Sequence, residues 1–312
     1  MNRTALCLLL NLGLIFCFTA IATAEPARVL FIAGDPSHGY GAHEHYAGCR
    51  LLAQTLKDSG LEVSVDVVRG WPREAKLLEE ADSIVIYCDG GERHLALAHV
   101  EKVGKLIDRG VGFVCIHYAV EVPQGEPGKL FLKWLGGYFE PYWSVNPHWT
   151  AHFDKLPEHE ITRGVGPFEA NDEWYFHMRF QPEMKGVTPI LSDVPPASTM
   201  ARRDGPHSGN PAVRKAVAAG EPQHVAWAYD RPDGGRSFGF TGGHYHWNWG
   251  REPYRRLVAN AILWTAKVEV PEHGAGAPPL GVAVLEENQD EEPGEGFDAE
   301  AIRSKFKLRG EN

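Results

Sequence analysis

The stretch VGFVCIHYA, residues 111–119, decides the fold class. Residues 111–116 are apolar or glycine without a polar interruption, and the run ends abruptly at His117. An unbroken apolar run of this length is typical of a strand that is buried on both faces of a parallel sheet. The stretch therefore predicts an internal strand, which must have similar strands as its neighbours.

The chain before residue 111 supplies those neighbours and the helices between them. The predicted strands are ARVLFIAGD (27–35), LEVSVDVV (61–68) and ADSIVIYCDGG (81–91), and the predicted helices are 46–60 and 94–110. Each helix has apolar residues at helical spacing and ends at a glycine, where a C-cap belongs. This alternation predicts an α/β fold with a doubly wound, largely parallel sheet.

The pattern of apolar and polar residues changes after residue 138. Short runs of near-alternating polarity predict additional short strands in the C-terminal half, and they read HWTAHF, EWYFHMRF, VTPILSDV and HVAWAYDR. The turn DRPDGG (230–235) predicts a hairpin, and 254–266 predicts a closing helix. One domain is expected over 25–268. Residues 269–312 hold 11 acidic and 4 basic side chains among many prolines and glycines, so a disordered acidic tail is expected there.

The first 24 residues have the pattern of a secretory signal peptide. Arg3 precedes a long apolar segment, and Ala22-Thr23-Ala24 has the small residues of a cleavage site. We expect an exported chain, periplasmic or secreted, with no stable membrane insertion after cleavage. An uncleaved anchor is the alternative, because the apolar segment is long enough to span a bilayer.

Charge, cysteines and motifs exclude several classes of protein. The net charge of −10 leaves no basic stripe of the kind that nucleic acid binding needs. Cys49, Cys88 and Cys115 form no CxxC pair, so we expect buried free thiols, with a Cys88–Cys115 disulfide as the alternative. The loop GDPSHGYG (34–41) does not match GxGxxG, and neither a phosphate-binding GxxxxGK[ST] nor a GxSxG serine motif occurs.

Histidine is the strongest sign of a site. Fifteen of the 312 residues are histidine, and several follow predicted strands. In a doubly wound sheet the loops after the strands converge on one cleft, here the loops that start at Gly34, Asp89 and His117. The HxH pairs could chelate a divalent metal, or the imidazoles could be a hydrogen-bonded polar lining. The candidate metal ligands are His43, His45, His117, His244 and His246.

The stretch NDEWYFHMRF (171–180) adds carboxylates beside aromatic rings. Such a carboxylate can have a raised pKa that suits acid–base catalysis, which makes Asp172 and Glu173 candidates. The alternative is that Asp172 caps a turn while Glu173 is simply exposed. Trp247 and Trp249 are candidate stacking surfaces for pyranose rings, although core packing is the commoner role of a tryptophan.

The stretch TGGHYHWNWG (241–250) is expected to be a wall of the cleft. We expect His117 and His244 to meet across the cleft, and Gly242 and Gly243 to allow a sharp turn. On a strand-like course, His244 and His246 would share one face and the two tryptophans the other. At least one of the tryptophans should pack against the closing helix.

Several segments together resemble a known family. They are VLFIAGDPSHGYGAHEH (29–45), GVGFVCIHYA (110–119), LPEHEITRGVGPFEANDEWY (156–175), GRSFGFTGGHYHWNW (235–249) and YRRLVANAILWTA (254–266). They resemble the ThuA-like (trehalose-utilisation) family of the class I glutamine amidotransferase-like superfamily, over roughly 27–267. The resemblance implies a flavodoxin-like fold and a role in the metabolism of trehalose or related disaccharides. The family's motif positions correspond to His117, His159, Asp172, Glu173, Tyr175 and His244.

The chain departs from the amidotransferases of that superfamily at the turn after residue 116. Their nucleophilic cysteine lies in a Gly-x-Cys-x-Gly elbow, but here His117 stands at the elbow and Cys115 lies within the predicted strand. We therefore expect no glutaminase activity.

The sequence thus predicts an exported protein that acts on a small-molecule carbohydrate, a sugar or glycoside such as a disaccharide or keto-glycoside. The expected catalytic residues are His117, Glu173, Asp172 and His244. The expected substrate-binding residues are His43, His45, Tyr175, His246, Trp247 and Trp249. A non-catalytic carbohydrate-binding or scaffold protein is one alternative, and a metal-dependent hydrolase of another substrate is a third.

Overall fold

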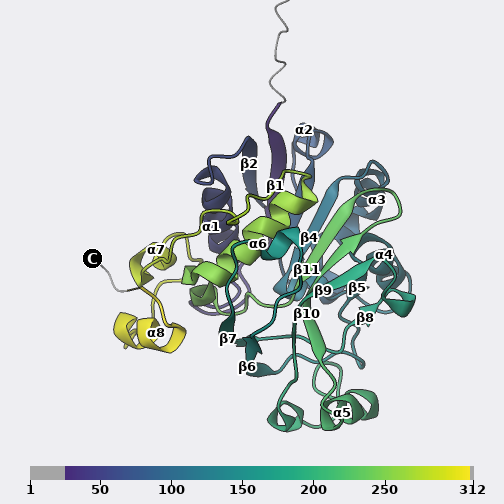
Figure 1. Ribbon diagram of the computed structural model, residues 1–312, viewed down its shortest axis with the longest axis vertical. Coiled ribbons are helices and arrows are strands. Elements are labelled where there is room, and N and C mark those ends of the chain that lie inside the picture. Colours follow the sequence, from purple (N-terminus) through teal and green to yellow (C-terminus); the bar gives the residue numbers. More distant parts are fainter. Residues whose placement is uncertain (1–24, 310–312) are drawn as a thin grey trace, which may run out of the picture.

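The computed structural model describes residues 25–309, so the predicted signal peptide lies outside the described residues. Its centre is a seven-stranded sheet with the strand order β2-β1-β3-β4-β11-β10-β9 (Figure 1). The strands of this sheet are β1 (Ala27–Ala33), β2 (Val63–Arg69), β3 (Ser83–Tyr87), β4 (Gly112–Ile116), β9 (Val187–Asp193), β10 (Gln223–Asp230) and β11 (Arg236–Phe240).

Five neighbouring strands of the sheet, from β2 to β11, run parallel. Strand β10 is antiparallel to both of its neighbours, and it forms the predicted hairpin with β11. All five residues of β4 are buried, as the unbroken apolar run predicts. The predicted doubly wound, flavodoxin-like fold with a largely parallel sheet is confirmed.

Helices cover both faces of the sheet and divide the core in two. Along β1, Val29 and Phe31 point into one core, whereas Leu30 and Ile32 point into the other. The helices α1 (His45–Lys57) and α6 (Glu252–Thr265) contribute to the first core. The helices of the second core are α2 (Ala75–Glu79), α3 (Val100–Asp108) and α4 (Glu126–Leu135).

The additional strands lie partly outside the main sheet. Strands β6 (His148–Phe153) and β7 (Phe168–Glu173) form an antiparallel pair, and so do β5 (Gly137–Tyr138) and β8 (Arg179–Phe180). The expected strand EWYFHMRF is wrong over most of its length, because β7 ends at Glu173 and the aromatic residues that follow are buried outside a strand. The remaining α-helix before the closing one is α5 (Pro211–Ala218).

Short 3-10 helices fill many of the connections. They are η1 (Gly91–Arg93), η2 (Leu95–His99), η3 (His117–Val120), η4 (Glu160–Thr162), η5 (Pro182–Met184), η6 (Ala197–Met200) and η7 (His246–Gly250). Two of them matter for the site. Helix η3 begins directly after β4, and η7 follows β11, so both lie at carboxyl ends of parallel strands.

The expectation of a disordered tail is wrong. Residues 269–309, the C-terminal strap, contain α7 (Val282–Glu286) and α8 (Ala299–Phe306), drawn in yellow in Figure 1, and both helices contact η7. Leu285 is fully buried and Phe306 is 4% exposed. The overall composition is acidic, but these spaced apolar side chains pack on the domain, and their burial offsets the entropy lost on ordering the chain.

Two further features of the described residues concern the cysteine thiols and the length of apolar helices. Cys49, Cys88 and Cys115 are buried free thiols, as expected. Over residues 25–309, none of the helices combines the length and hydropathy needed to cross a membrane.

Candidate functional site

Four side chains from distant parts of the chain meet beyond the carboxyl ends of the parallel strands. His43 lies in the loop after β1, His117 is the first residue after β4, and His244 lies in the turn after β11. Glu173 is the last residue of β7. The fold therefore brings three imidazoles and one carboxylate to the edge of the sheet where ligands of such folds bind.

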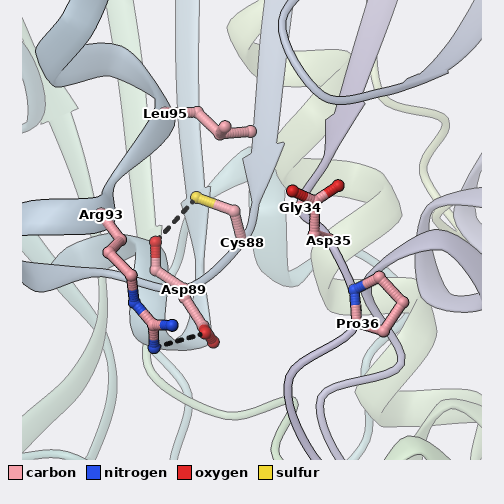
Figure 2. Close-up of a pocket in the computed structure, with 7 residues that line it drawn as sticks. All are labelled: Gly34, Asp35, Pro36, Cys88, Asp89, Arg93 and Leu95. Carbon is pink, nitrogen blue, oxygen red and sulfur yellow. Dashed lines mark hydrogen bonds and ion pairs between the residues drawn. The ribbon is translucent and has the colours of Figure 1, made fainter.

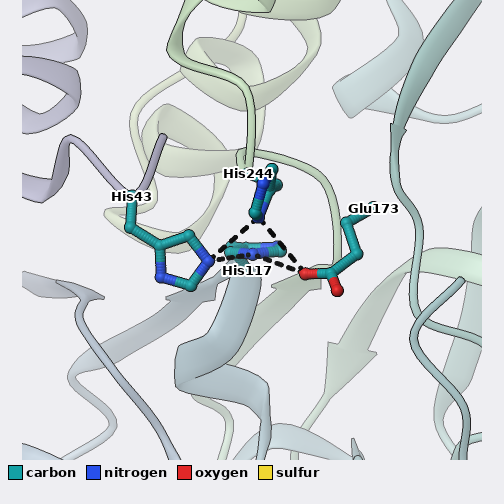
Figure 3. A group of neighbouring side chains, drawn as sticks. All are labelled: His43, His117, Glu173 and His244. Carbon is teal, nitrogen blue, oxygen red and sulfur yellow. Dashed lines mark hydrogen bonds and ion pairs between the residues drawn. The ribbon is translucent and has the colours of Figure 1, made fainter. Parts of the chain in front are cut away.

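Figure 3 shows that the polar atoms of the four side chains point at one another. His43 Nε2 lies 3.0 Å from His117 Nε2 and 3.1 Å from His244 Nδ1. Glu173 Oε2 lies 3.5 Å from His117 Nε2 and 3.3 Å from His244 Nδ1. One ligand atom from each residue lies within 4.8 Å of the others, which is compact enough to surround one metal ion.

The outer contacts of two histidines fix which nitrogen carries the proton. His117 Nδ1 lies 2.8 Å from the carbonyl oxygen of Thr241, which can only accept, so we infer that Nδ1 is protonated. His43 Nδ1 faces the Asp89 carboxylate at 3.2 Å, and the same inference follows. In the neutral form of each ring Nε2 is the unprotonated nitrogen, and the two Nε2 atoms face each other at 3.0 Å. A cation between them would be coordinated by both nitrogens.

The protonation states of these groups suit a bound cation. Burial lowers the pKa of His43 to about 2, so its imidazole is neutral. Burial alone would raise the pKa of Glu173, but the hydrogen bonds and charges of His117 and His244 outweigh it and hold that pKa well below its usual range. Neutral imidazole and ionised carboxylate are the forms that bind metals.

Two of the four residues are held in a strained backbone conformation. His43 has φ 52° and His117 has φ 56°, in the left-handed region that non-glycine residues rarely occupy. The surrounding contacts enforce this, since the His43 amide donates to the carbonyl of His244 at 3.0 Å. Strain of this kind costs about 1–3 kcal/mol per residue and concentrates at functional sites.

The expected meeting of His117 and His244 is confirmed, with ring centroids 5.5 Å apart. Tyr175 also reaches the group, because its hydroxyl lies 3.3 Å from His117 Nε2. Glu173 belongs to the group of converging side chains, as expected. Asp172 does not, since β7 directs the two carboxylates to opposite faces. Asp172 is fully buried and lies outside the group of ligand atoms.

Asp172 instead organises the turn that carries His244. Its carboxylate accepts from the amide of Gly243 at 2.9 Å, from the amide of Tyr245 at 3.2 Å and from the hydroxyl of Tyr254 at 2.6 Å. The side chain of Asn248 donates to it as well, at 3.0 Å. Asp172 is therefore a positioning residue, and the expectation that it is catalytic is corrected.

The second histidine of each HxH pair does not join the group. His45 Nε2 lies 3.9 Å from the carboxylate of Asp89, which is not one of the four residues. Its Nδ1 faces the carbonyl of Asp35 at 3.2 Å. His246 is fully buried in η7, against Leu285 of α7. The two segments turn between the paired histidines instead of running as strands, so the expectation that His244 and His246 share a face is wrong.

The expected rim of tryptophans is also corrected. Trp247 is 4% exposed and lies against Tyr40 and Phe297, with ring centroids 5.6 and 6.0 Å away. Trp249 is fully buried and packs on Tyr254 of the closing helix at 5.1 Å, which confirms that at least one of the pair packs there. Neither offers a face for sugar stacking.

One histidine named by the family motif serves its own loop. His159 Nδ1 accepts the amide of Ile161 at 3.1 Å and so caps η4. Its ring lies 5.1 Å from that of Trp264 in the closing helix. His159 therefore braces the loop before β7 and belongs to no candidate metal-binding group among the described residues.

Sequence reasoning missed residues on both sides of the group. His38 stacks on His43 with ring centroids 3.6 Å apart, and together with Asp89 they form a second possible metal-binding set. Asp89 is the second residue after β3, so its place at a strand end was a usable signal. On the other side, His148 Nε2 lies 3.8 Å from Glu173 Oε1, because the two residues pair across β6 and β7.

A small pocket opens next to Asp89 (Figure 2). It has a volume of about 100 Å³ and lies between the ends of β1 and β3. The residues that line it are Gly34, Asp35, Pro36, Cys88, Asp89, Arg93 and Leu95. Because Asp89 also contacts His43, a small polar group bound there would lie beside the four-residue group.

The model of the ThuA family, described as trehalose utilisation, matches residues 28–265. The chain belongs to the ThuA family. None of the curated proteins compared with it matches. The matched span contains all four converging side chains and ends before the C-terminal strap.

Solved structures of ThuA-like proteins share the fold. One from Bacteroides uniformis ATCC 8492 superposes with a TM-score of 0.51 at 18% identity, over 80% of this chain and 95% of that one. Another, from Parabacteroides merdae ATCC 43184, has a TM-score of 0.50 at 14% identity, over 81% of this chain and 97% of that one. A glutamine amidotransferase from Methylobacillus flagellatus has a TM-score of 0.35 at 12% identity, over 88% of this chain and 100% of that one.

Proposed function

We propose that this ThuA family protein is a carbohydrate-active enzyme whose chemistry takes place at a divalent metal ion. The proposed ligands are His43, His117, Glu173 and His244. The observation that carries the proposal is the convergence of three imidazole nitrogens and one carboxylate oxygen within 4.8 Å. Shifted pKa values and strained backbone at the same place support a functional site.

The ligand set favours a first-row transition ion. Three imidazoles and one carboxylate suit Zn²⁺, Fe²⁺ or a related ion, whereas Ca²⁺ and Mg²⁺ prefer oxygen ligands. The contacts of Asp89 with His43 Nδ1 and of the Thr241 carbonyl with His117 Nδ1 orient the two rings, as such contacts do in metal sites. When bound, such an ion would polarise a carbonyl or hydroxyl group of the substrate.

The groups around the four ligands have the chemistry needed to bind and move protons on a sugar. The hydroxyl of Tyr175 reaches His117, and His148 is close to Glu173 with its side chain 46% exposed. Burial lowers the pKa of His148, so its neutral imidazole could accept a proton from a substrate hydroxyl near pH 7. The carbohydrate class rests on the family description, trehalose utilisation.

Metal binding is the first test. Protein stripped with a chelator should bind about one Zn²⁺ or Co²⁺ per chain, measured by competition with a chromophoric chelator. Glu173→Gln and His117→Ala should weaken this binding at least about 100-fold, since each removes one of the proposed metal ligands. His152→Ala is the matched control, because His152 lies on β6 near His148 but is 54% exposed and contacts Glu169 instead. Equal binding by all of these variants would contradict the proposal.

Turnover is the second test. The metal-loaded protein should convert a member of a panel of disaccharides, glycosides and keto-glycosides, and the chelator-treated protein should not. Binding of sugars without any turnover would favour the non-catalytic carbohydrate-binding role instead.

We also propose that the protein is exported and lacks glutaminase activity. The signal-peptide pattern of residues 1–24 supports export, and fractionation with N-terminal sequencing of the product would test it. The placement of His117 at the elbow and of Cys115 inside β4 supports the absence of glutaminase chemistry.

A further inference from the structure

The segments that carry His43 and His244 are joined to each other by backbone hydrogen bonds. The amide of His43 donates to the carbonyl of His244 at 3.0 Å, and the amide of His246 donates to the carbonyl of Gly41 at 3.0 Å. Ala42 and Tyr245 form an antiparallel bridge between these bonds. Residues 40–44 and 244–246 therefore behave as one unit, and any displacement of the unit moves both histidines.

The C-terminal strap holds the first half of this unit with polar contacts. The amide of Gly41 donates to Gln289 Oε1 at 2.9 Å, and the hydroxyl of Tyr40 donates to Glu286 Oε1 at 2.8 Å. The amide of Asp290 donates to Glu44 Oε2 at 2.7 Å, next to His43 in the chain. Gly41 itself has φ +77°, and a Cβ there would lie 2.5 Å from the indole of Trp247, so only glycine fits at this position.

Apolar contacts from the strap reach both halves of the unit. The ring of Phe297 lies 5.2 Å from Tyr40 and 6.0 Å from Trp247. Phe306 lies 5.4 Å from Tyr245, which is the neighbour of His244. An ion pair of 2.7 Å between Arg69 and Asp290 anchors the strap to the end of β2.

We propose that the C-terminal strap is the positioning element of the metal centre, which fixes His43 and His244 in the geometry that binds the ion. The inference rests on the proposed metal-dependent function, and it assigns a role to residues that follow the span shared with the family. Among the described residues, no hydrogen bond or ion pair joins the strap to the side chain of any of the four ligands. It acts through the joined backbone of residues 40–44 and 244–246.

The test compares two variants of the full-length chain. The double variant Gln289→Met/Phe297→Ala removes the strap's acceptor for the Gly41 amide, whose other acceptor is Glu44 Oε1 at 3.1 Å, and the ring against Tyr40. Methionine keeps the length of glutamine. The control is Val270→Ala, because Val270 is a fully buried strap residue in the core and its carbonyl accepts from Arg163, remote from the ligand-bearing unit. Both variants should lose some thermal stability.

The first measurement is Co²⁺ affinity, with the visible absorption of the bound ion as a report on its coordination. We expect the double variant to bind Co²⁺ about 10–100-fold more weakly with an altered spectrum, because the contacts that hold the ligand-bearing segment in place are lost. Val270→Ala should stay within about threefold of the unchanged chain, because its packing defect is not transmitted to the ligands. A folded double variant with unchanged affinity and spectrum would overturn the inference.

The second measurement is amide hydrogen exchange at residues 40–44 without metal, which separates this inference from the proposed function. The double variant should exchange at least about tenfold faster there than Val270→Ala, because local opening becomes easier. If the unchanged chain binds no Co²⁺, the proposed metal function fails, and so does the strap's role in metal binding. Faster exchange in the double variant would then show only that the strap holds residues 40–44 in place. Unchanged exchange would show that the strap does not hold them either.

Discussion

Asp172 and Glu173 are neighbours in the chain, but they belong to different parts of the molecule. Asp172 is fully buried among donors from the turn after β11, whereas Glu173 reaches His117 and His244. The cause is the alternation of β7, which directs successive side chains to opposite faces. One carboxylate shapes the wall of the site and the next belongs to its centre, so proximity in sequence says little about role.

The HxH pairs show the same division for another reason. His43 and His244 join the group, whereas His45 and His246 are buried beside it. A spacing of two would place both members on one face of a strand, but these segments are a loop before α1 and a turn before η7. The local backbone, which the spacing does not specify, decides which histidine reaches the site.

The largest expected effect tests the different roles of Asp172 and Glu173, and it is an effect on stability. Asp172→Asn should reduce the free energy of unfolding by about 3–5 kcal/mol, because an amide cannot accept from all the donors that surround the buried carboxylate. Glu173→Gln should change it by less than about 1 kcal/mol. Urea denaturation of the two metal-free variants measures both. Similar losses from the two substitutions would mean that both carboxylates are structural.

Metal affinity provides the next test, on the histidine pairs. His43→Ala and His244→Ala should each raise the dissociation constant for Zn²⁺ at least about 100-fold, since each removes a ligand. His246→Phe should leave it within about threefold, because neither ring nitrogen of His246 has a well-formed hydrogen-bond partner among the described residues. Competition with a chromophoric chelator reports each constant. A loss of affinity in His246→Phe equal to that in His244→Ala would contradict the assignment.

The parts of the structure that were predictable from the sequence depend on periodic patterns. Residues 111–116 predicted an internal strand, and Gly60 and Gly110 predicted the ends of α1 and α3 to within three residues, because apolar runs and caps are local signals. The meeting of His117 and His244 was predictable because both follow strands of one parallel sheet.

The remaining features depend on contacts between distant segments. His148 joins the site only because β6 pairs with β7 in a register that places it opposite Glu173. The strap was expected to be disordered because composition averages over its residues, but Leu285 and Phe306 have complementary surfaces on η7 and Tyr245. Single apolar residues in an acidic segment carry no periodicity from which docking could be predicted.

The smallest expected effect concerns Cys115 and His117, two further near neighbours with different roles. Cys115 is fully buried in β4, and burial raises the pKa of its thiol well above the usual range, so almost no nucleophilic thiolate is present. His117 instead occupies the strained turn after the strand.

We therefore expect no labelling of Cys115 by iodoacetamide in the native protein and no release of ammonia from glutamine. Mass spectrometry of the alkylated chain, with the urea-unfolded chain as positive control, measures the first. Glutamine hydrolysis that disappears in Cys115→Ser would show instead that the elbow can open and expose a reactive thiol.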